Sequence, residues 1–178
     1  VSGIVPGYEH VLPQRPAWHA CACCPPNLAR LIASLGKYLW SEDEGTVYSH
    51  LFIGSEVETR YGRISMTSGY PWEGKAEYTI HDGGDFALTI HVPQHAVNMT
   101  LRINGEEVSN VTADGYCRIQ RNWQPDDRIA VEFDMPVRSI HAHPRVRGAA
   151  GEVALMRGPL VCCVEDADHE AILSGIVL

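Results

Sequence analysis

The sequence lacks long apolar runs and has no run of basic residues. Lysine and arginine together number 14 against 22 aspartates and glutamates, which gives a formal net charge of −8. Nucleic acids and anionic membranes attract basic surfaces, so an acidic chain without a basic cluster argues against both. Every apolar stretch is interrupted by glycine, proline or charge well before the roughly 20 residues that a membrane span needs. We therefore expect neither nucleic acid nor a membrane as a partner.

The first residues, VSGIVPGYEH, also lack the features of a secretory signal: there is no basic segment and no long apolar segment. Because an initiator methionine is missing as well, we interpret the chain as a fragment of a longer protein and expect a cytoplasmic location. The six cysteines do not have the pattern of a small disulfide-rich secreted domain, since they include two adjacent pairs in a chain of 178 residues. We expect reduced thiols.

One segment has a helical pattern. In PPNLARLIASLGKYLW, residues 25–40, leucine and isoleucine recur at helical spacing, and proline is tolerated in a first turn. The acidic run at residues 41–44 and Gly45 are expected to end this helix. An isolated helix that is apolar on one face needs a partner surface.

After Gly45 the pattern changes to alternation with a period of two, as in FALTIHV at residues 86–92. MTLRINGEEV at residues 99–108 adds a tight-turn signal at Asn104 and Gly105, and DDRIAVEFDMP repeats the alternation. Further strands are expected at residues 46–53, 61–68, 76–81, 116–122, 137–142, 152–157 and 159–165.

Some ten short strands with no helix between them predict a mainly β fold, an antiparallel β-sandwich preceded by a loop and one α-helix. We expect residues 1–44 to be the end of an incomplete helical domain and residues 45–178 to form the sandwich domain.

The run HACACCPPNLARL, residues 19–31, is the strongest chemical signal. Cys23 and Cys24 directly precede two prolines at a helix start, where unpaired N–H groups favour a thiolate. Zinc favours the thiolate more strongly, and His19 or Cys21 could add a third ligand. Burial of small side chains at a tight junction is the alternative, and we favour metal binding or catalysis.

The segment CACCPPNLARLIASLGKYLW resembles the bacterial β-L-arabinofuranosidases of glycoside hydrolase family 127. The resemblance continues through four further segments: RINGE, RNWQPDDRIAVEFDMPVR, AHPRV and GEVALMRGPLVCCVE. It implies an (α/α)6 catalytic barrel followed by an accessory β-sandwich, so that the helix would belong to the barrel.

The resemblance also implies a zinc ion held by one glutamate and three cysteines, with a separate glutamate as acid/base. Cys23 would be the nucleophile of a retaining mechanism and a zinc ligand, and Cys24 a second zinc ligand. The remaining ligands and the acid/base would lie upstream of residue 1. We therefore expect the parent enzyme to use zinc and to take its carbohydrate substrate in the barrel, whereas the fragment alone neither holds zinc tightly nor hydrolyses glycosides. The exposed helix could also support a homo-oligomer.

Other residues carry weaker signals. The pairs His91/His95 and His141/His143 could chelate a metal, but we expect ordinary surface histidines. Two acidic pairs, at residues 106–107 and 126–127, lie beside turn signals and are expected to be solvated or to cap turns. We expect Trp123 in the core and leave Trp72 open as a loop aromatic. We expect Cys162 and Cys163 to serve packing.

Two alternatives to the glycosidase interpretation stay open. One is a non-catalytic β-sandwich module that binds carbohydrate or protein. The other is a small structural zinc protein built around His19, Cys21, Cys23 and Cys24.

Overall fold

The computed structural model of the chain describes residues 23–109 and 112–163, and it divides after Gly36 into two compact units. The first unit contains helix α1 (Cys24–Ser34), which starts with two prolines in its first turn. The short helix α2 (Gly36–Leu39) begins at the last residue of the first unit, and all the strands lie in the second unit. The expected single helix is therefore two helices, because the backbone N–H of Leu35 bonds to Ile32 in a tighter turn.

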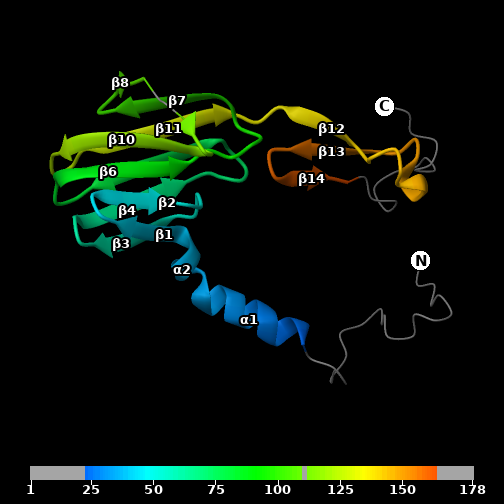
Figure 1. Cartoon of the computed structure of the whole chain (residues 1–178), viewed down its shortest axis with the longest axis horizontal. Helices are drawn as coiled ribbons and strands as arrows, with labels where there is room; N and C mark the ends of the chain where they lie inside the picture. The colour runs from blue at the N-terminus through cyan, green and yellow to red at the C-terminus, as the bar shows by residue number, and fades with distance from the viewer. Residues whose placement is uncertain (1–22, 110–111, 164–178) are drawn as a thin grey trace. The chain divides into compact units, whose positions relative to one another are not determined.

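The strands form three sheets, two of which make the sandwich (Figure 1). The five-stranded sheet has the order β1 (Trp40–Asp43), β2 (Thr46–Ser49), β6 (Gly84–His91), β10 (Tyr116–Trp123) and β9 (Thr112–Ala113). The pairing of β2 with β6 is parallel, and the other pairings in this sheet are antiparallel. The acidic run that was expected only to end the helix contributes to edge strand β1.

The six-stranded sheet is antiparallel throughout. Its order is β3 (Ser55–Thr59), β4 (Gly62–Ser68), β5 (Lys75–Ile80), β11 (Arg128–Asp134), β7 (Val97–Ile103) and β8 (Glu106–Glu107). The predicted tight turn between β7 and β8 is confirmed, since Asn104 and Gly105 both have positive φ, at 54° and 87°.

A separate three-stranded antiparallel sheet follows the sandwich. It contains β12 (Val137–His141), β13 (Val153–Arg157) and β14 (Leu160–Cys162), with a single 3₁₀ turn, η1 (Arg147–Ala149), between the first two strands. All ten expected strands are present, and the mainly β prediction is confirmed. Four short strands, β1, β3, β8 and β9, were not expected.

The core lies between the two large sheets, which explains why apolar and polar residues alternate along the strands. Its largest fully buried side chains come from both sheets: Trp123, Tyr78, Phe86, Ile64, Ile80, Leu88, Ile90, Leu101, Ile129, Val47, Val131 and Cys117. The predicted core position of Trp123 is confirmed, because the side chain is 1% exposed and its indole N–H donates to the carbonyl of Phe86 at 3.0 Å. Along the part of the chain that the structure describes, no helix is long and apolar enough to cross a membrane.

The turn before β11 is held by one buried carboxylate, Asp127, which is 5% exposed. It accepts hydrogen bonds from the backbone N–H of Gln124 at 2.9 Å and from the side-chain amide of Asn104 at 2.8 Å, and Arg121 lies 3.7 Å away. Burial acts to raise the pKa of Asp127, but these three groups together lower the pKa below its usual value. The prediction that this acidic pair serves a turn is confirmed at Asp127.

We predict that Asp127→Asn lowers the free energy of unfolding by about 1–3 kcal/mol at pH 7, because the buried donors lose a charged acceptor. The pKa of Asp127 is lower in the folded state, so its contribution is fully present above the unfolded pKa of about 3.9 and is lost as the pH falls through the folded value. Urea unfolding of both proteins from pH 7 to pH 2.5 measures this, and the two curves should converge at the acid end. Asp126→Asn is the matched control, since Asp126 is exposed and has a positive φ that asparagine tolerates. A constant difference at every pH would contradict the prediction.

The strand pair β5–β11 depends on a close backbone approach at Gly74. The carbonyl of Gly74 accepts a 2.8 Å hydrogen bond from the N–H of Phe133, and an added Cβ would overlap the carbonyl oxygen of Phe133. We predict that Gly74→Ala destabilises the sandwich by about 1–3 kcal/mol or more, because backbone atoms must move. Thermal unfolding checks this against Gly36→Ala, where an added Cβ meets no atom within 4 Å. Equal melting temperatures for the two variants would contradict the prediction.

Candidate functional site

The adjacent thiols lie at the start of α1. Cys23 is the N-cap residue, with helical backbone angles, and Cys24 is the first residue of the helix. Both are exposed, and their sulfur atoms are 3.7 Å apart. This distance excludes a disulfide bond, whose sulfur atoms are about 2.05 Å apart. The structure therefore presents two free sulfurs side by side at a helix N-terminus.

Local hydrogen bonds fix the backbone that carries these sulfurs. The carbonyl of Cys23 accepts from the backbone N–H of Asn27 at 3.3 Å and from its side-chain amide at 2.8 Å. Arg30 in turn donates to the Asn27 side chain at 2.6 Å. The first turn contains no acidic residue, so the partial positive charge of the helix end is not neutralised there.

The sulfur spacing fits half of a zinc site. Two thiolates on one tetrahedral zinc, with bonds of about 2.3 Å, lie about 3.8 Å apart, close to the 3.7 Å observed. Within residues 23–109 and 112–163, no three histidine, cysteine or acidic side chains come together in a group that could hold a metal ion. His19 and Cys21, the proposed local ligands, lie outside the described residues. The described part therefore offers two of the four donors.

The apolar side of α1 is open. Leu28, Leu31 and Ile32 are 58%, 51% and 64% exposed, although their spacing is that of a helix face that packs against a partner. The helix that carries the two thiols therefore has an apolar face that is exposed among the described residues.

The histidine pairs do not form metal sites among the described residues. His91 contacts the ring of Tyr116, with centroids 5.4 Å apart, whereas His95 stacks on Tyr70 at 6.0 Å. Burial, Arg138 and His91 lower the pKa of His95. His141 ends β12, and His143 accepts a hydrogen bond from the backbone of Arg145 at 3.2 Å. His91, His95 and His143 thus each contact protein groups.

Other candidates from the sequence also have structural positions. Trp72 is 70% exposed in its loop, and its carbonyl accepts from Arg157 at 2.8 Å. Cys162 and Cys163 are both exposed, so the expectation that they serve packing is wrong. The apolar strand that suggested packing does not bury them, because β14 has only three residues at the edge of a small sheet. Cys117 is the buried cysteine of the sandwich core.

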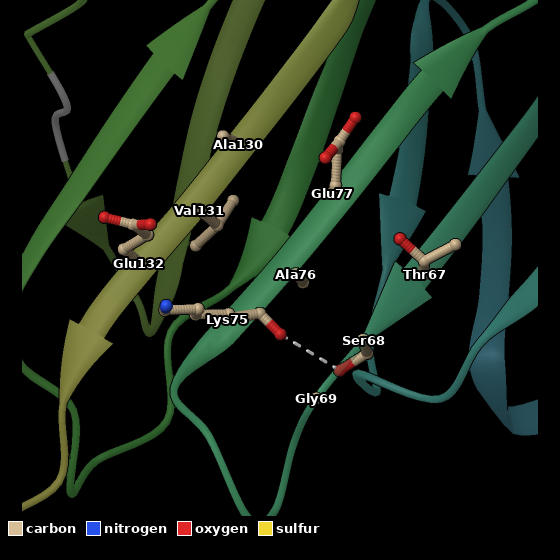
Figure 2. Close-up of a pocket in the computed structure, with 9 residues that line it drawn as sticks. All are labelled: Thr67, Ser68, Gly69, Lys75, Ala76, Glu77, Ala130, Val131 and Glu132. Carbon is tan, nitrogen blue, oxygen red and sulfur yellow. Dashed lines mark hydrogen bonds between the residues drawn. The ribbon is translucent and has the colours of Figure 1, made fainter.

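A shallow depression of about 280 Å³ lies on the six-stranded sheet, over β4, β5 and β11 (Figure 2). Its charged side chains are Lys75, Glu77 and Glu132. Glu77 pairs with Arg128 at 3.4 Å and Glu132 pairs with Arg102 at 3.2 Å, so both carboxylates already have partners. The depression is lined by no cysteine or histidine, and we assign it no chemistry.

The sequence analysis missed one group of side chains, on the side of the five-stranded sheet that faces away from the core. Tyr48 and His50 from β2 and the segment after it, His91 from β6 and Tyr116 from β10 contact one another there. The available signal was that Tyr48 and His50 are two residues apart and therefore share a face. The pairing of β2, β6 and β10 could not be predicted from that spacing.

Comparisons with known proteins identify the family of the chain. Residues 46–135 match the family model described as beta-L-arabinofuranosidase, GH127 middle domain, and residues 137–178 match the glycoside hydrolase family 127 C-terminal domain. The chain is 39% identical over 173 residues to the non-reducing end beta-L-arabinofuranosidase of Bifidobacterium longum subsp. longum, covering 92% of this chain and 26% of that protein.

Two solved structures are similar as well. The crystal structure of a GH127 beta-L-arabinofuranosidase from Geobacillus stearothermophilus T6 aligns with a TM-score of 0.75 and 40% identity, over 89% of this chain and 26% of that one. Another GH127 beta-arabinofuranosidase aligns with a TM-score of 0.73 and 31% identity, over 81% of this chain and 26% of that one. The chain thus spans about a quarter of the length of these relatives. It belongs to glycoside hydrolase family 127 and corresponds to a part of such an enzyme that includes its middle and C-terminal domains.

Proposed function

We propose that this chain supplies the thiol half of the active site of a zinc-dependent retaining glycoside hydrolase that acts on β-L-arabinofuranosides or related sugars. The observation that carries the proposal is the pair of exposed sulfurs, 3.7 Å apart, at the start of α1 in a chain of this family. Cys23 is the proposed nucleophile and a zinc ligand, and Cys24 is the second ligand from this chain.

The proposed chemistry follows from the properties of a thiolate. The Cys23 sulfur attacks the anomeric carbon of the sugar; a C–S bond forms, and the glycosidic C–O bond breaks. The leaving oxygen takes a proton from an acid in another part of the enzyme. Water then attacks the same carbon and gives its proton to the resulting base, and the C–S bond breaks to restore the thiolate. Two displacements at one carbon retain its configuration.

Zinc bound by both sulfurs would keep Cys23 ionised at neutral pH, because a coordinating thiol is deprotonated. The chain itself places the two sulfurs. The carbonyl of Cys23 is fixed by Asn27, and the helix end adds partial positive charge near the thiolate.

Since the described residues contribute two donors and no acid aimed at this site, we propose that the chain alone neither holds zinc tightly nor turns over a glycoside. Its zinc and its carbohydrate partner would be bound together with the rest of a longer enzyme.

We predict that the purified chain retains well under one zinc per molecule after dialysis against a mild chelator. The reason is that zinc gains less binding free energy from two thiolates than from a complete tetrahedral set of ligands. Residual weak binding should fall at least about tenfold in the Cys23→Ser/Cys24→Ser variant. Zinc titration with a competing chromophoric chelator measures both quantities. The control is Cys162→Ser/Cys163→Ser, which removes an equally exposed adjacent pair elsewhere. Stoichiometric, high-affinity zinc in the unmodified chain would contradict the proposal of an incomplete site.

We predict that Cys23→Ala, introduced into the longer enzyme that contains this chain, lowers kcat on a chromogenic β-L-arabinofuranoside by about 10³-fold or more, because the bond-forming atom is lost. Added azide should restore part of the turnover with inverted product, since a small nucleophile can enter from the vacated side. Cys162→Ala should leave kcat within about twofold. Full activity of the Cys23→Ala enzyme would refute the assignment of Cys23 as the nucleophile.

A further inference from the structure

The two outer faces of the sandwich, which point away from the core, differ in charge. The outer face of the six-stranded sheet carries four ion pairs: Arg63–Glu56, Arg102–Glu107, Arg102–Glu132 and Arg128–Glu77. Such a pattern is typical of a sheet face in water. On the outer face of the five-stranded sheet, by contrast, no ion pair is present among the described side chains. Aromatic rings lie there together with Arg118 and Asp85, which are hydrogen-bonded to neutral side chains.

Tyr116 is the centre of that second face. It lies opposite His91 in the pairing of β10 with β6, and β6 pairs on its other side with β2. Its phenol oxygen is nevertheless within 2.8 Å of Nδ1 of His50, the residue after β2. The side chain must therefore reach across β6 to the far side of that strand.

The angles between ring planes describe how Tyr116 is oriented relative to the neighbouring rings. The rings of Tyr48 and His50 are nearly parallel, at 5°, with centroids 6.0 Å apart. The Tyr116 ring is perpendicular to both, at 90° and 87°. The Tyr116 ring lies at 60° to His91, with centroids 5.4 Å apart. Tyr116 is only partly buried, so part of the residue is open to solvent.

Hydrogen bonds hold this ring in place. Nε2 of His50 is hydrogen-bonded to the hydroxyl of Ser41 at 2.7 Å, and Nδ1 to the phenol of Tyr116 at 2.8 Å. Burial and the neighbouring His91 lower the pKa of His50, so the imidazole stays neutral and can accept as well as donate. Thr89, on the same face of β6, is only 4% exposed. The rings are thus packed against the sheet in a fixed position.

Polar groups border the ring. Arg118, on the same face of β10, is exposed and donates to Thr46 at 2.8 Å and to Gln120 at 3.2 Å. Gln120 donates to Asp85 at 3.0 Å. Arg118 has five N–H donors and uses two of them in these bonds, so the remaining ones can face a ligand.

We propose that this face, with Tyr116 as its floor and Tyr48, His50, His91 and Arg118 around it, binds a neutral saccharide through residues other than the thiols. Sugars present an apolar C–H face, which stacks on a flat aromatic ring, and hydroxyls that pair with neutral donors and acceptors at its border. A strongly charged ligand fits less well, because the only charged side chains named here, Arg118 and Asp85, have opposite signs. The site goes beyond the proposed catalytic role, since it uses neither Cys23 nor Cys24.

The test is a titration of the whole chain with neutral oligosaccharides of three to six sugars from arabinan, xylan and cellulose, followed by ¹H–¹⁵N NMR. At least one series should give saturable shifts that map to Tyr48, His50, His91, Tyr116 and Arg118. Tyr116→Ala should weaken binding at least tenfold. Tyr116→Phe should keep it within about threefold, because the ring stays and only the hydrogen bond to His50 is lost.

Two further variants keep the test decisive if Tyr116→Ala does not fold. Arg118→Ala removes an exposed side chain and should weaken binding about threefold or more. Trp72→Ala removes a strongly exposed aromatic outside this face, at 70% exposure, and should change the dissociation constant less than twofold. Three outcomes would overturn the proposal: no saturable shifts up to 20 mM sugar, binding lost in Trp72→Ala and kept in Tyr116→Ala, or shifts at this face caused by self-association alone. Because no turnover is measured, the result is independent of the proposed thiol chemistry.

Discussion

Burial of strand β6 on both faces is the constraint on which the sandwich depends. Five consecutive residues, 86–90, are at most 4% exposed. Phe86, Leu88 and Ile90 point into the core, and such alternation alone would leave Ala87 and Thr89 in water. They are covered because β6 lies in the middle of its sheet, between a parallel neighbour and an antiparallel one. Thr46 and Gln120 flank Ala87, and Tyr48 and Arg118 flank Thr89. The aromatic group thus lies on strands that the sandwich already contains, and no additional element is needed to hold it.

The same constraint explains why the two outer faces differ. The six-stranded sheet can leave its outer side to water, since charged side chains from neighbouring strands pair there, as Arg102 does with Glu132. Each such exposed pair adds little stability, about 0–1 kcal/mol, so this face serves mainly solubility. The outer side of the five-stranded sheet holds rings whose positions are fixed by hydrogen bonds through His50. A fixed aromatic surface loses little side-chain entropy when a ligand binds, which is the property that a recognition surface needs.

Much of the fold could be predicted from the sequence, because a period of two is a local property of the chain. The strands from β4 to β14, apart from the two-residue strands β8 and β9, follow from alternation and turn signals, and Asn104–Gly105 forms the predicted turn. The edge strand β1 was missed because its acidic residues have low strand propensity, and pairing with β2 overrides that preference. Cys23 and Cys24 could be identified because adjacency is also local. The group around Tyr116 could not, since its members come from three strands spread over 69 residues and meet only through strand order and register.

The two proposed sites also differ in what completes them. The sulfurs at Cys23 and Cys24 satisfy one geometric condition of a zinc site, their spacing, but a tetrahedral metal needs four donors and the described chain brings two together. The cysteine of the sandwich core, Cys117, is fully buried among apolar side chains and is a packing residue. The platform at Tyr116, in contrast, is assembled entirely by the pairing of β2, β6 and β10 and needs no residue from elsewhere. The proposed chemistry therefore depends on a longer protein, whereas the proposed recognition depends only on the pairing within the sheet, and substitutions in one chain can test the two separately.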